Sequence, residues 1–121
     1  MTHPTGFLSP YRVLDLTDQR GLLAGRMLAQ LGADVIQIEP PGGSPARALA
    51  PLDTSAPPEH QSMYWAAYAS CKRGVTCDLE RPAGQELLLR LAAKADFIIE
   101  SERPGVMAER GLGHERLREA N

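Results

Sequence analysis

The segment LGADVIQIEPPGG, residues 31–43, decides the fold class of this 121-residue chain. Its apolar run VIQI (35–38) predicts a strand over 34–39, and the Pro-Pro-Gly-Gly that follows predicts the turn at the end of that strand. Gly32 predicts the end of a preceding helix, because glycine readily takes the positive φ of the C′ position. The Gly-Gly pair leaves three interpretations open: a phosphate-binding loop, a plain turn, or the rim of a site for another ligand.

A strand and a helix are predicted upstream of this segment. YRVLDL (11–16) predicts a strand, and Asp18 is a candidate N-cap for the helix that follows. The apolar residues of that helix recur at the spacing of one helical face: Leu22, Leu23, Met27, Leu28 and Leu31. Strand, helix and strand within about thirty residues make a βαβ unit with two parallel strands.

The downstream sequence alternates in the same way. Residues 40–60 carry six of the ten prolines and predict a long ordered loop or a mobile flap. Further elements are predicted in this order: a helix over 61–70, a strand over 74–79 that includes Cys77, a helix over 82–95 with Pro82 in its first turn, a strand over 96–100, and short helical segments over 103–111 and 113–121. The pattern predicts an α/β fold, a Rossmann-like and mainly parallel sheet with flanking helices, in a domain that is incomplete within residues 1–121.

Composition excludes several classes of function. The formal net charge of −2 gives no electrostatic attraction to nucleic acid. No apolar run approaches the ~20 residues of a membrane span, and the N-terminal sequence lacks a secretory signal, so a cytoplasmic protein is expected. Cys71 and Cys77 are expected to be small, half-buried thiols, and no metal is expected because His3, His60 and His114 lie far apart without ligand spacing.

Known phosphate-binding motifs are absent, but the first βα turn remains a candidate site. Gly21 and Gly25 do not have the spacing of a dinucleotide fingerprint, and no glycine precedes the lysine and hydroxyl of a P-loop. The turn nevertheless faces the carboxyl end of the sheet, where open α/β folds bind ligands. A helix N-terminus near residue 19, together with Arg20, offers positive charge to an anion. An ordinary crossover turn is the alternative.

Two further basic segments lie at strand ends. Lys72 and Arg73 adjoin a predicted strand, so their side chains point to opposite faces and only one easily reaches a given ligand; the alternative is a pair of solvated edge charges. Arg103 is held extended by Pro104, and Gly105 allows close approach to the backbone, which predicts a binding loop. No spacing indicates a Ser-His or Cys-His pair, so no catalytic residue is predicted in this chain.

Four segments taken together carry a resemblance. RVLDLT, LAQLGADVIQIEPPGG, SCKRGVTCDLERPAGQELLLRLAAKADFIIESERPG and ERGLG occur in order from about Leu8, and with them the chain resembles the N-terminal part of the family III CoA-transferases, the CaiB/BaiF family. The resemblance implies a homodimeric enzyme that moves coenzyme A from an acyl-CoA to a carboxylic acid through an Asp-bound intermediate. It equally admits the α-methylacyl-CoA racemase branch. It places the catalytic aspartate beyond Asn121, so that this chain alone is expected to be inactive.

The resemblance also assigns candidate binding residues for coenzyme A and implies no metal. They fall in the first turn, the basic pair, the end of the third strand and the loop after the fourth: Gln19, Arg20, Gly21, Leu22, Lys72, Arg73, Cys77, Asp78, Ser101, Arg103, Pro104 and Gly105. The family's Asn before the basic pair is here Cys71, and its Asn-Phe in the last loop is here Ser101 and Glu102. Pro-Pro-Gly-Gly then becomes an exit turn at the rim of the CoA site. The rival interpretation is a non-catalytic fragment or module that pairs with a partner chain through an unfinished sheet edge.

Overall fold

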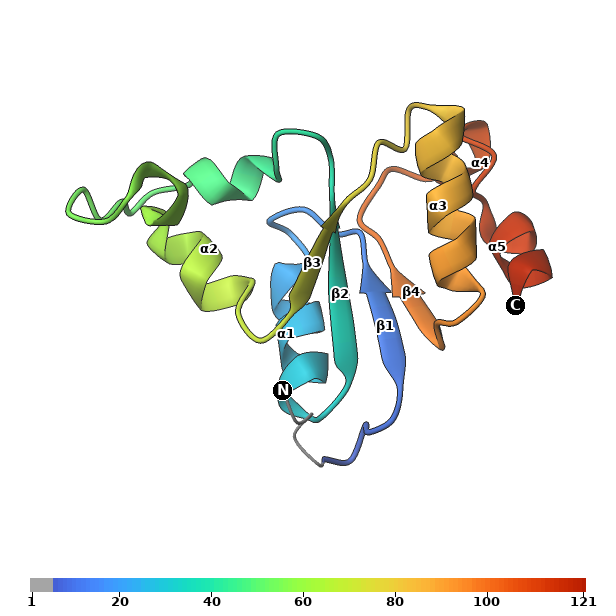
Figure 1. Cartoon of the computed structure of the whole chain (residues 1–121), viewed down its shortest axis with the longest axis horizontal. Helices are drawn as coiled ribbons and strands as arrows, with labels where there is room; N and C mark the ends of the chain where they lie inside the picture. The colour runs from blue at the N-terminus through green and yellow to red at the C-terminus, as the bar shows by residue number, and fades with distance from the viewer. Residues whose placement is uncertain (1–5) are drawn as a thin grey trace.

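A computed structural model describes residues 6–121 and contains one parallel sheet of four strands (Figure 1). The strands are β1 (Arg12–Asp15), β2 (Asp34–Glu39), β3 (Arg73–Thr76) and β4 (Phe97–Ile99), in the spatial order β3-β2-β1-β4. The helices are α1 (Leu22–Gln30), α2 (Met63–Tyr68), α3 (Pro82–Ala92), α4 (Val106–Glu109) and α5 (His114–Ala120), with 3₁₀ turns η1 (Pro45–Ala48) and η2 (Pro58–His60). The predicted α/β class, the strands and the parallel pairing are confirmed.

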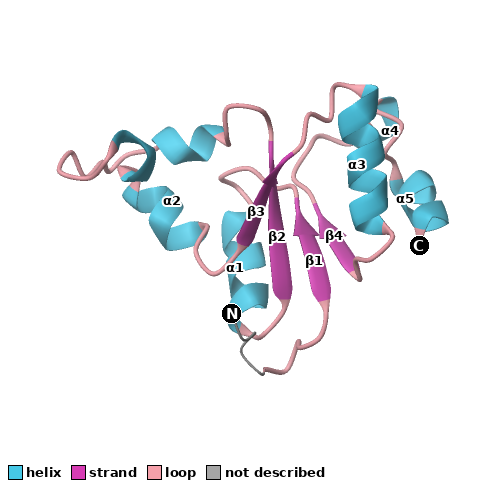
Figure 2. Ribbon diagram, viewed as in Figure 1, coloured by secondary structure: helices cyan, strands magenta, loops and turns pink. Residues whose placement is uncertain are grey.

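Helices cover both faces of the sheet, as expected for a parallel sheet (Figure 2). On one face, Leu14, Ile36 and Ile38 pack with residues of α3, α4 and α5. On the other face, Val13 and Val35 pack with Ala29 of α1. The central strands β1 and β2 are therefore buried on both sides, and α2 forms an arm beside β3 with no fully buried residue.

The first helix differs from its prediction in two ways. It begins at Leu22 with Gly21 as N-cap, so the prediction of Asp18 as N-cap is wrong; the Asp18 carboxylate instead accepts hydrogen bonds from the backbone N–H and guanidinium of Arg20. The predicted apolar face is only partly correct: Leu22 is buried and Leu28 packs against the core, but its other three residues are exposed. The side chains of Leu23, Met27 and Leu31 remain about half exposed, at 47%, 55% and 46%. Gly25 and Ala29 face the sheet instead, because small residues allow a helix to approach a sheet closely.

The Pro-Pro-Gly-Gly segment forms a turn. The N–H of Gly43 donates to the carbonyl of Pro40 at 2.9 Å, and Gly42 and Gly43 have φ of 85° and 90°, which non-glycine residues rarely adopt. The rest of the predicted 40–60 loop is ordered into η1, η2 and a bridge between Leu52 and Ser62. The segment therefore forms the exit turn of β2 and leads into η1.

The third strand is shorter than predicted. It ends at Thr76, so the prediction that Cys77 lies within the strand is wrong. Cys77 is buried just beyond it, where its thiol donates to the carbonyl of Gly84 at 3.0 Å and burial raises its pKa. Cys71 is exposed, so half-burial holds for neither thiol. Within residues 6–121 no helix has the length and apolar character of a membrane span, and His3 lies outside the described residues.

Candidate functional site

The carboxyl ends of β1 and β4 bring two predicted binding loops together. Because β1 and β4 are neighbours, the turn after β1 and the loop after β4 emerge side by side. The N–H of Asp18 donates to Ser101 Oγ at 2.9 Å, and Arg20 Nη2 donates to the Ser101 carbonyl at 2.7 Å. The structure therefore joins the first βα turn to Ser101 across 83 residues of sequence.

The first turn presents a cation beside an uncapped helix end. The Arg20 guanidinium holds Asp18 through both carboxylate oxygens, and these hydrogen bonds keep the pKa of Asp18 below its usual value. The Arg20 side chain is still 63% exposed, and Gln19 is exposed beside it, with its carbonyl accepting from the Tyr64 hydroxyl at 2.9 Å. No side chain caps the amino end of α1 at Gly21, whereas the Leu22 side chain is buried.

The loop after β4 is more loosely attached. Arg103, Pro104 and Gly105 are exposed, and Arg103 forms no ion pair with any residue in the described part of the chain. Arg110 neutralises Glu102 at 3.1 Å and also pairs with Glu80 at 2.6 Å. Sequence reasoning missed Arg110 because its two partners lie 8 and 30 residues away in different elements.

The basic pair is divided between the interior and the opposite end of the sheet. Lys72 is buried beneath the first turn with its side chain 1% exposed, and it pairs with the buried Asp15 at 2.7 Å. Arg73 pairs with Asp34, which starts β2 and also accepts from Arg12. These two arginines hold the pKa of Asp34 below its usual value against the opposing effect of burial. The structure therefore does not bring Arg73 to the carboxyl end of the sheet.

The two remaining candidates flank the exit of β3. Cys77 belongs to the core on the α3 face of the sheet, so its thiol packs beneath the loop. The carboxylate of Asp78 accepts from the N–H of Glu80 at 3.1 Å and pairs with Arg81 at 3.3 Å. Asp78 is half-buried and separated from the first turn by β2, so these two residues form a separate part of the rim.

A charged cluster that the sequence analysis did not identify occupies the exit of β2. Arg47 donates to both oxygens of Glu39 at 2.7 Å, and its guanidinium carbon lies 4.3 Å from the centroid of the Trp65 ring. Burial raises the pKa of Glu39, but the bonds from Arg47 and the N–H of Ser44 outweigh it and keep the pKa below its usual value. A cavity of about 390 Å³ opens here between Glu39, Arg47 and the backbone of Gly42, Gly43 and Gly74.

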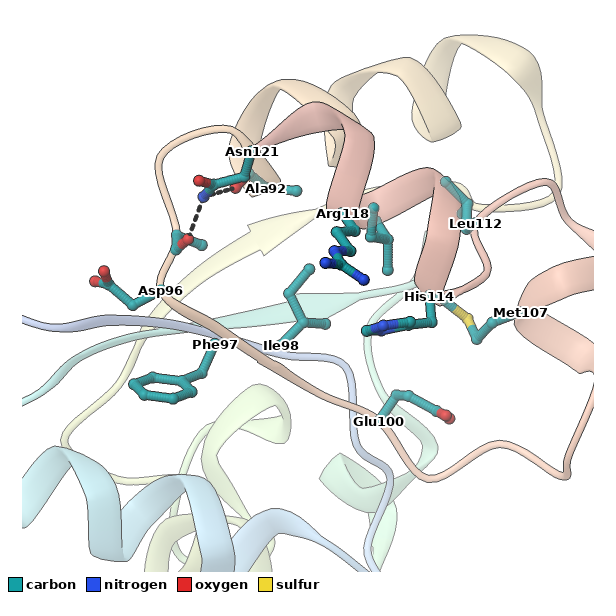
Figure 3. Close-up of a pocket in the computed structure, with 12 residues that line it drawn as sticks. Ala92, Asp96, Phe97, Ile98, Glu100, Met107, Leu112, His114, Arg118 and Asn121 are labelled. Carbon is teal, nitrogen blue, oxygen red and sulfur yellow. Dashed lines mark hydrogen bonds between the residues drawn. The ribbon is translucent and has the colours of Figure 1, made fainter.

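A cavity of about 590 Å³ lies beside the edge strand β4. Figure 3 shows Arg118 and His114 projecting from α5 toward Ile98 of β4, and Glu100 at one end of the cavity. The Asn121 amide closes the other end by donating to the carbonyls of Ala92 and Ala95 at 3.0 and 2.6 Å. Across residues 6–121, no three His, Cys, Asp or Glu side chains gather as a metal site.

Comparisons with known proteins agree with this geometry. Residues 8–121 match the profile of CoA-transferase family III. The sequence is 40% identical over 113 residues to the succinyl-CoA:(R)-benzylsuccinate CoA-transferase subunit BbsE of Thauera aromatica, covering 93% of this chain and 28% of BbsE. It is 40% identical over 121 residues to the probable fatty acyl-CoA transferase Rv3272 of Mycobacterium tuberculosis, covering 99% of this chain and 30% of that protein.

Solved structures give the same result. The crystal structure of a CaiB/BaiF family protein from Brucella suis matches with a TM-score of 0.88 at 33% identity, covering 98% of this chain and 32% of that one. The crystal structure of Rv3272 matches with a TM-score of 0.85 at 39% identity and the same two coverages. The chain thus spans about a third of the length of the proteins that it matches.

Proposed function

Because the chain belongs to CoA-transferase family III, we propose that it forms the CoA-binding N-terminal part of an enzyme that moves coenzyme A from an acyl-CoA to a carboxylic acid. The observation that carries this proposal is the junction between Arg20 and Ser101. It joins two loops at the carboxyl end of a parallel sheet, the position at which open α/β folds bind nucleotide-like ligands.

Within this proposal, the exposed groups of the two loops contact coenzyme A. Arg20 and Arg103 are exposed cations at the rim, and coenzyme A carries a diphosphate and a further phosphate that such cations bind. Gln19 and Ser101 add side-chain hydrogen bonds, and the uncapped end of α1 adds the backbone N–H of Leu22, since the N–H of Gly21 already donates to the carbonyl of Asp18. Pro104 and Gly105 belong to the same exposed loop as Ser101, and Asp78 would lie on the adenine side of the rim.

The chemistry of transfer is assigned to polypeptide outside this chain. The relatives are about three times longer, so we propose that the carboxylate nucleophile, the acceptor site and the homodimer contacts belong to a longer cytoplasmic protein. Both relatives named above are transferases, which favours CoA transfer over racemisation. We expect purified residues 1–121 to bind CoA without transferring it between an acyl-CoA and a free acid.

Calorimetric titration with coenzyme A tests the proposal. We expect wild-type protein to bind, and Arg20→Met and Arg103→Met each to weaken binding by about tenfold, the equivalent of one charge-assisted contact. Arg116→Met is the matched control, because Arg116 is an exposed arginine of α5 with only Glu119 as a partner. Absence of heat with folded protein at millimolar CoA, or an equal loss in Arg116→Met, would overturn the proposal.

A second function, a module that pairs with another chain through β4, is favoured by the cavity beside that strand. β4 is an edge strand, and its first residue, Phe97, is 53% exposed. Such an edge invites pairing with a further strand. Light scattering after size-exclusion chromatography tests this function. A monomer at all concentrations would exclude self-pairing, and co-expression with the gene product encoded next to this one tests a separate partner.

A further inference from the structure

Lys72 has no donor left for a ligand. Its ammonium group donates to Asp15 Oδ2 at 2.7 Å, Gln37 Oε1 at 2.9 Å and the carbonyl of Leu22 at 2.9 Å. A lysine ammonium carries three protons, so all three are used within the protein. With the side chain 1% exposed, Lys72 lies under the first βα turn and not on its surface.

The same buried cluster also fixes the chain that rises from β1 into the turn. The second oxygen of Asp15 accepts from the N–H of Thr17 at 2.9 Å and from its hydroxyl at 2.6 Å. The amide of Gln37 donates to the carbonyl of Thr17 at 3.1 Å. The N–H and the carbonyl of Thr17, and the carbonyl of Leu22, are therefore held by one connected network of hydrogen bonds. We call it the Lys72 network, and its members are Asp15, Thr17, Leu22, Gln37 and Lys72.

Two features of the backbone are adapted to this network. A Cβ at Gly25 would overlap with the Asp15 carboxylate and lie 3.0 Å from Lys72 Nζ, so the absence of a side chain at Gly25 makes room for the ion pair beneath α1. Cys71, the residue before Lys72, has φ of 69°, which is uncommon for a residue other than glycine. That left-handed turn directs the chain from α2 into β3 with Lys72 pointing inward.

From this geometry we infer that Lys72 is a positioning residue and not a ligand contact. It sets the shape of the first βα turn so that Gln19 and Arg20 are presented at the rim. The inference rests on the proposed function where it concerns coenzyme A, and it corrects the direct contact that the family resemblance implied. A compact ammonium suits this place, because a guanidinium is larger and confines its donors to one plane.

The test uses the fact that the chain has only two lysines, Lys72 and Lys94. Lys94 is exposed at the end of α3, so Lys94→Met is the matched control. In protein labelled with ¹⁵N-lysine, we expect a protected ammonium signal from Lys72 that is lost in Lys72→Met, kept in Lys94→Met, and unchanged when coenzyme A is added. A Lys72 signal that moves on titration as far as the amide of Arg20 would overturn the inference.

The conformation of the first βα turn is monitored by the backbone amide chemical shifts of the protein without ligand. We expect Lys72→Met to shift the amides of Thr17, Gln19 and Arg20 and to leave the amides of α5 unchanged. If Lys72→Met does not fold, Gln37→Met gives the same readout, because it keeps the ion pair and removes the bond to the Thr17 carbonyl. Unchanged amides in the turn of a folded variant would contradict the positioning role whether or not coenzyme A binds.

The affinity for coenzyme A then distinguishes a positioning role of Lys72 from a role in fold stability alone. We expect folded Lys72→Met to bind coenzyme A about tenfold more weakly, since a turn that is no longer preorganised must be ordered on binding. A residue that only stabilises the fold would lower the unfolding midpoint and leave the affinity of the folded protein unchanged. If wild-type protein does not bind coenzyme A, the proposed function fails, while the shifts in the ligand-free turn still decide the inference.

Discussion

The first βα turn and the loop after β4 meet at Arg20 and Ser101, yet they are held in different ways. The turn is fixed from beneath by the Lys72 network, whose ion pair is buried from solvent. The loop is held at the surface by the Glu102–Arg110 pair and by the contacts of Ser101. Buried, fully paired polar groups make a region rigid, whereas exposed ion pairs contribute little. The comparison indicates that the turn is preorganised and that the loop can adjust to a ligand.

Among the variants that test this comparison, Asp15→Ala should cause the largest loss of stability. Lys72 would keep a buried charge without its partner, and the loss of one partner of a buried pair costs about 3–5 kcal/mol. The matched control is Asp18→Ala, which removes an exposed pair with Arg20 and should cost about 1 kcal/mol or less. Urea unfolding measures both losses, and equal losses would show that the two carboxylates are anchored alike.

Arg47→Met extends the comparison to the exit of β2. Glu39 has a lowered pKa, so the bond stabilises the protein above the unfolded pKa of about 4.3 and is lost as pH falls through the folded value. We expect a loss of about 1–3 kcal/mol at pH 7, because a mostly buried carboxylate would lose its partner. The difference from wild type should shrink below pH 4, a range set by the same unfolded pKa. Unfolding measured at pH 7 and below pH 4 tests whether the loss of stability shrinks as the pH falls. Arg81→Met is the exposed control.

Ser101→Ala should separate the two loops. The Asp18 N–H would lose its acceptor, which corresponds to about 1 kcal/mol for a typical hydrogen bond. We expect faster hydrogen exchange at the Asp18 amide, with exchange at Thr17 unchanged because the Lys72 network still holds it. Equal acceleration at both amides would mean that the loop supports the whole turn.

Arg103→Met should have the smallest effect on stability. Arg103 is exposed and has no ion-pair partner in residues 6–121, so the change should lie within about 0.5 kcal/mol. Arg110→Met is the control within the same loop, and it should cost about 1 kcal/mol by releasing Glu80 and Glu102. Thermal unfolding distinguishes the two, and a large loss in Arg103→Met would reveal a structural contact.

The sequence supports the fold better than the details of the site. The period of the apolar residues and the Pro-Pro-Gly-Gly exit predict the strands, because these depend on local patterns, and the alternation of strands with helices predicts their parallel pairing. The face of α1 could not be predicted this way. Leu23 and Met27 continue the apolar stripe, but the sheet selects Gly25 and Ala29, whose small size permits close packing.

Signals for the Lys72 network were present in the sequence but needed the strand register to be understood. Asp15 and Gln37 are polar residues inside apolar strands, and they lie directly opposite each other in the β1–β2 pairing. A buried polar pair requires a partner, which here comes from Lys72, 57 residues from Asp15. The cluster of Glu39, Arg47 and Trp65 could not be anticipated, because an irregular loop carries no period.

The central position of β1 in the strand order has a consequence for biosynthesis. On the ribosome, β1, β2 and β3 emerge before β4. The first βα turn is therefore translated some eighty residues before Ser101, which it contacts in the folded protein. Until β4 docks, the edge of β1 that pairs with it remains unpaired. A chain truncated between α3 and β4 would thus have three of the four strands and lack the junction between Arg20 and Ser101.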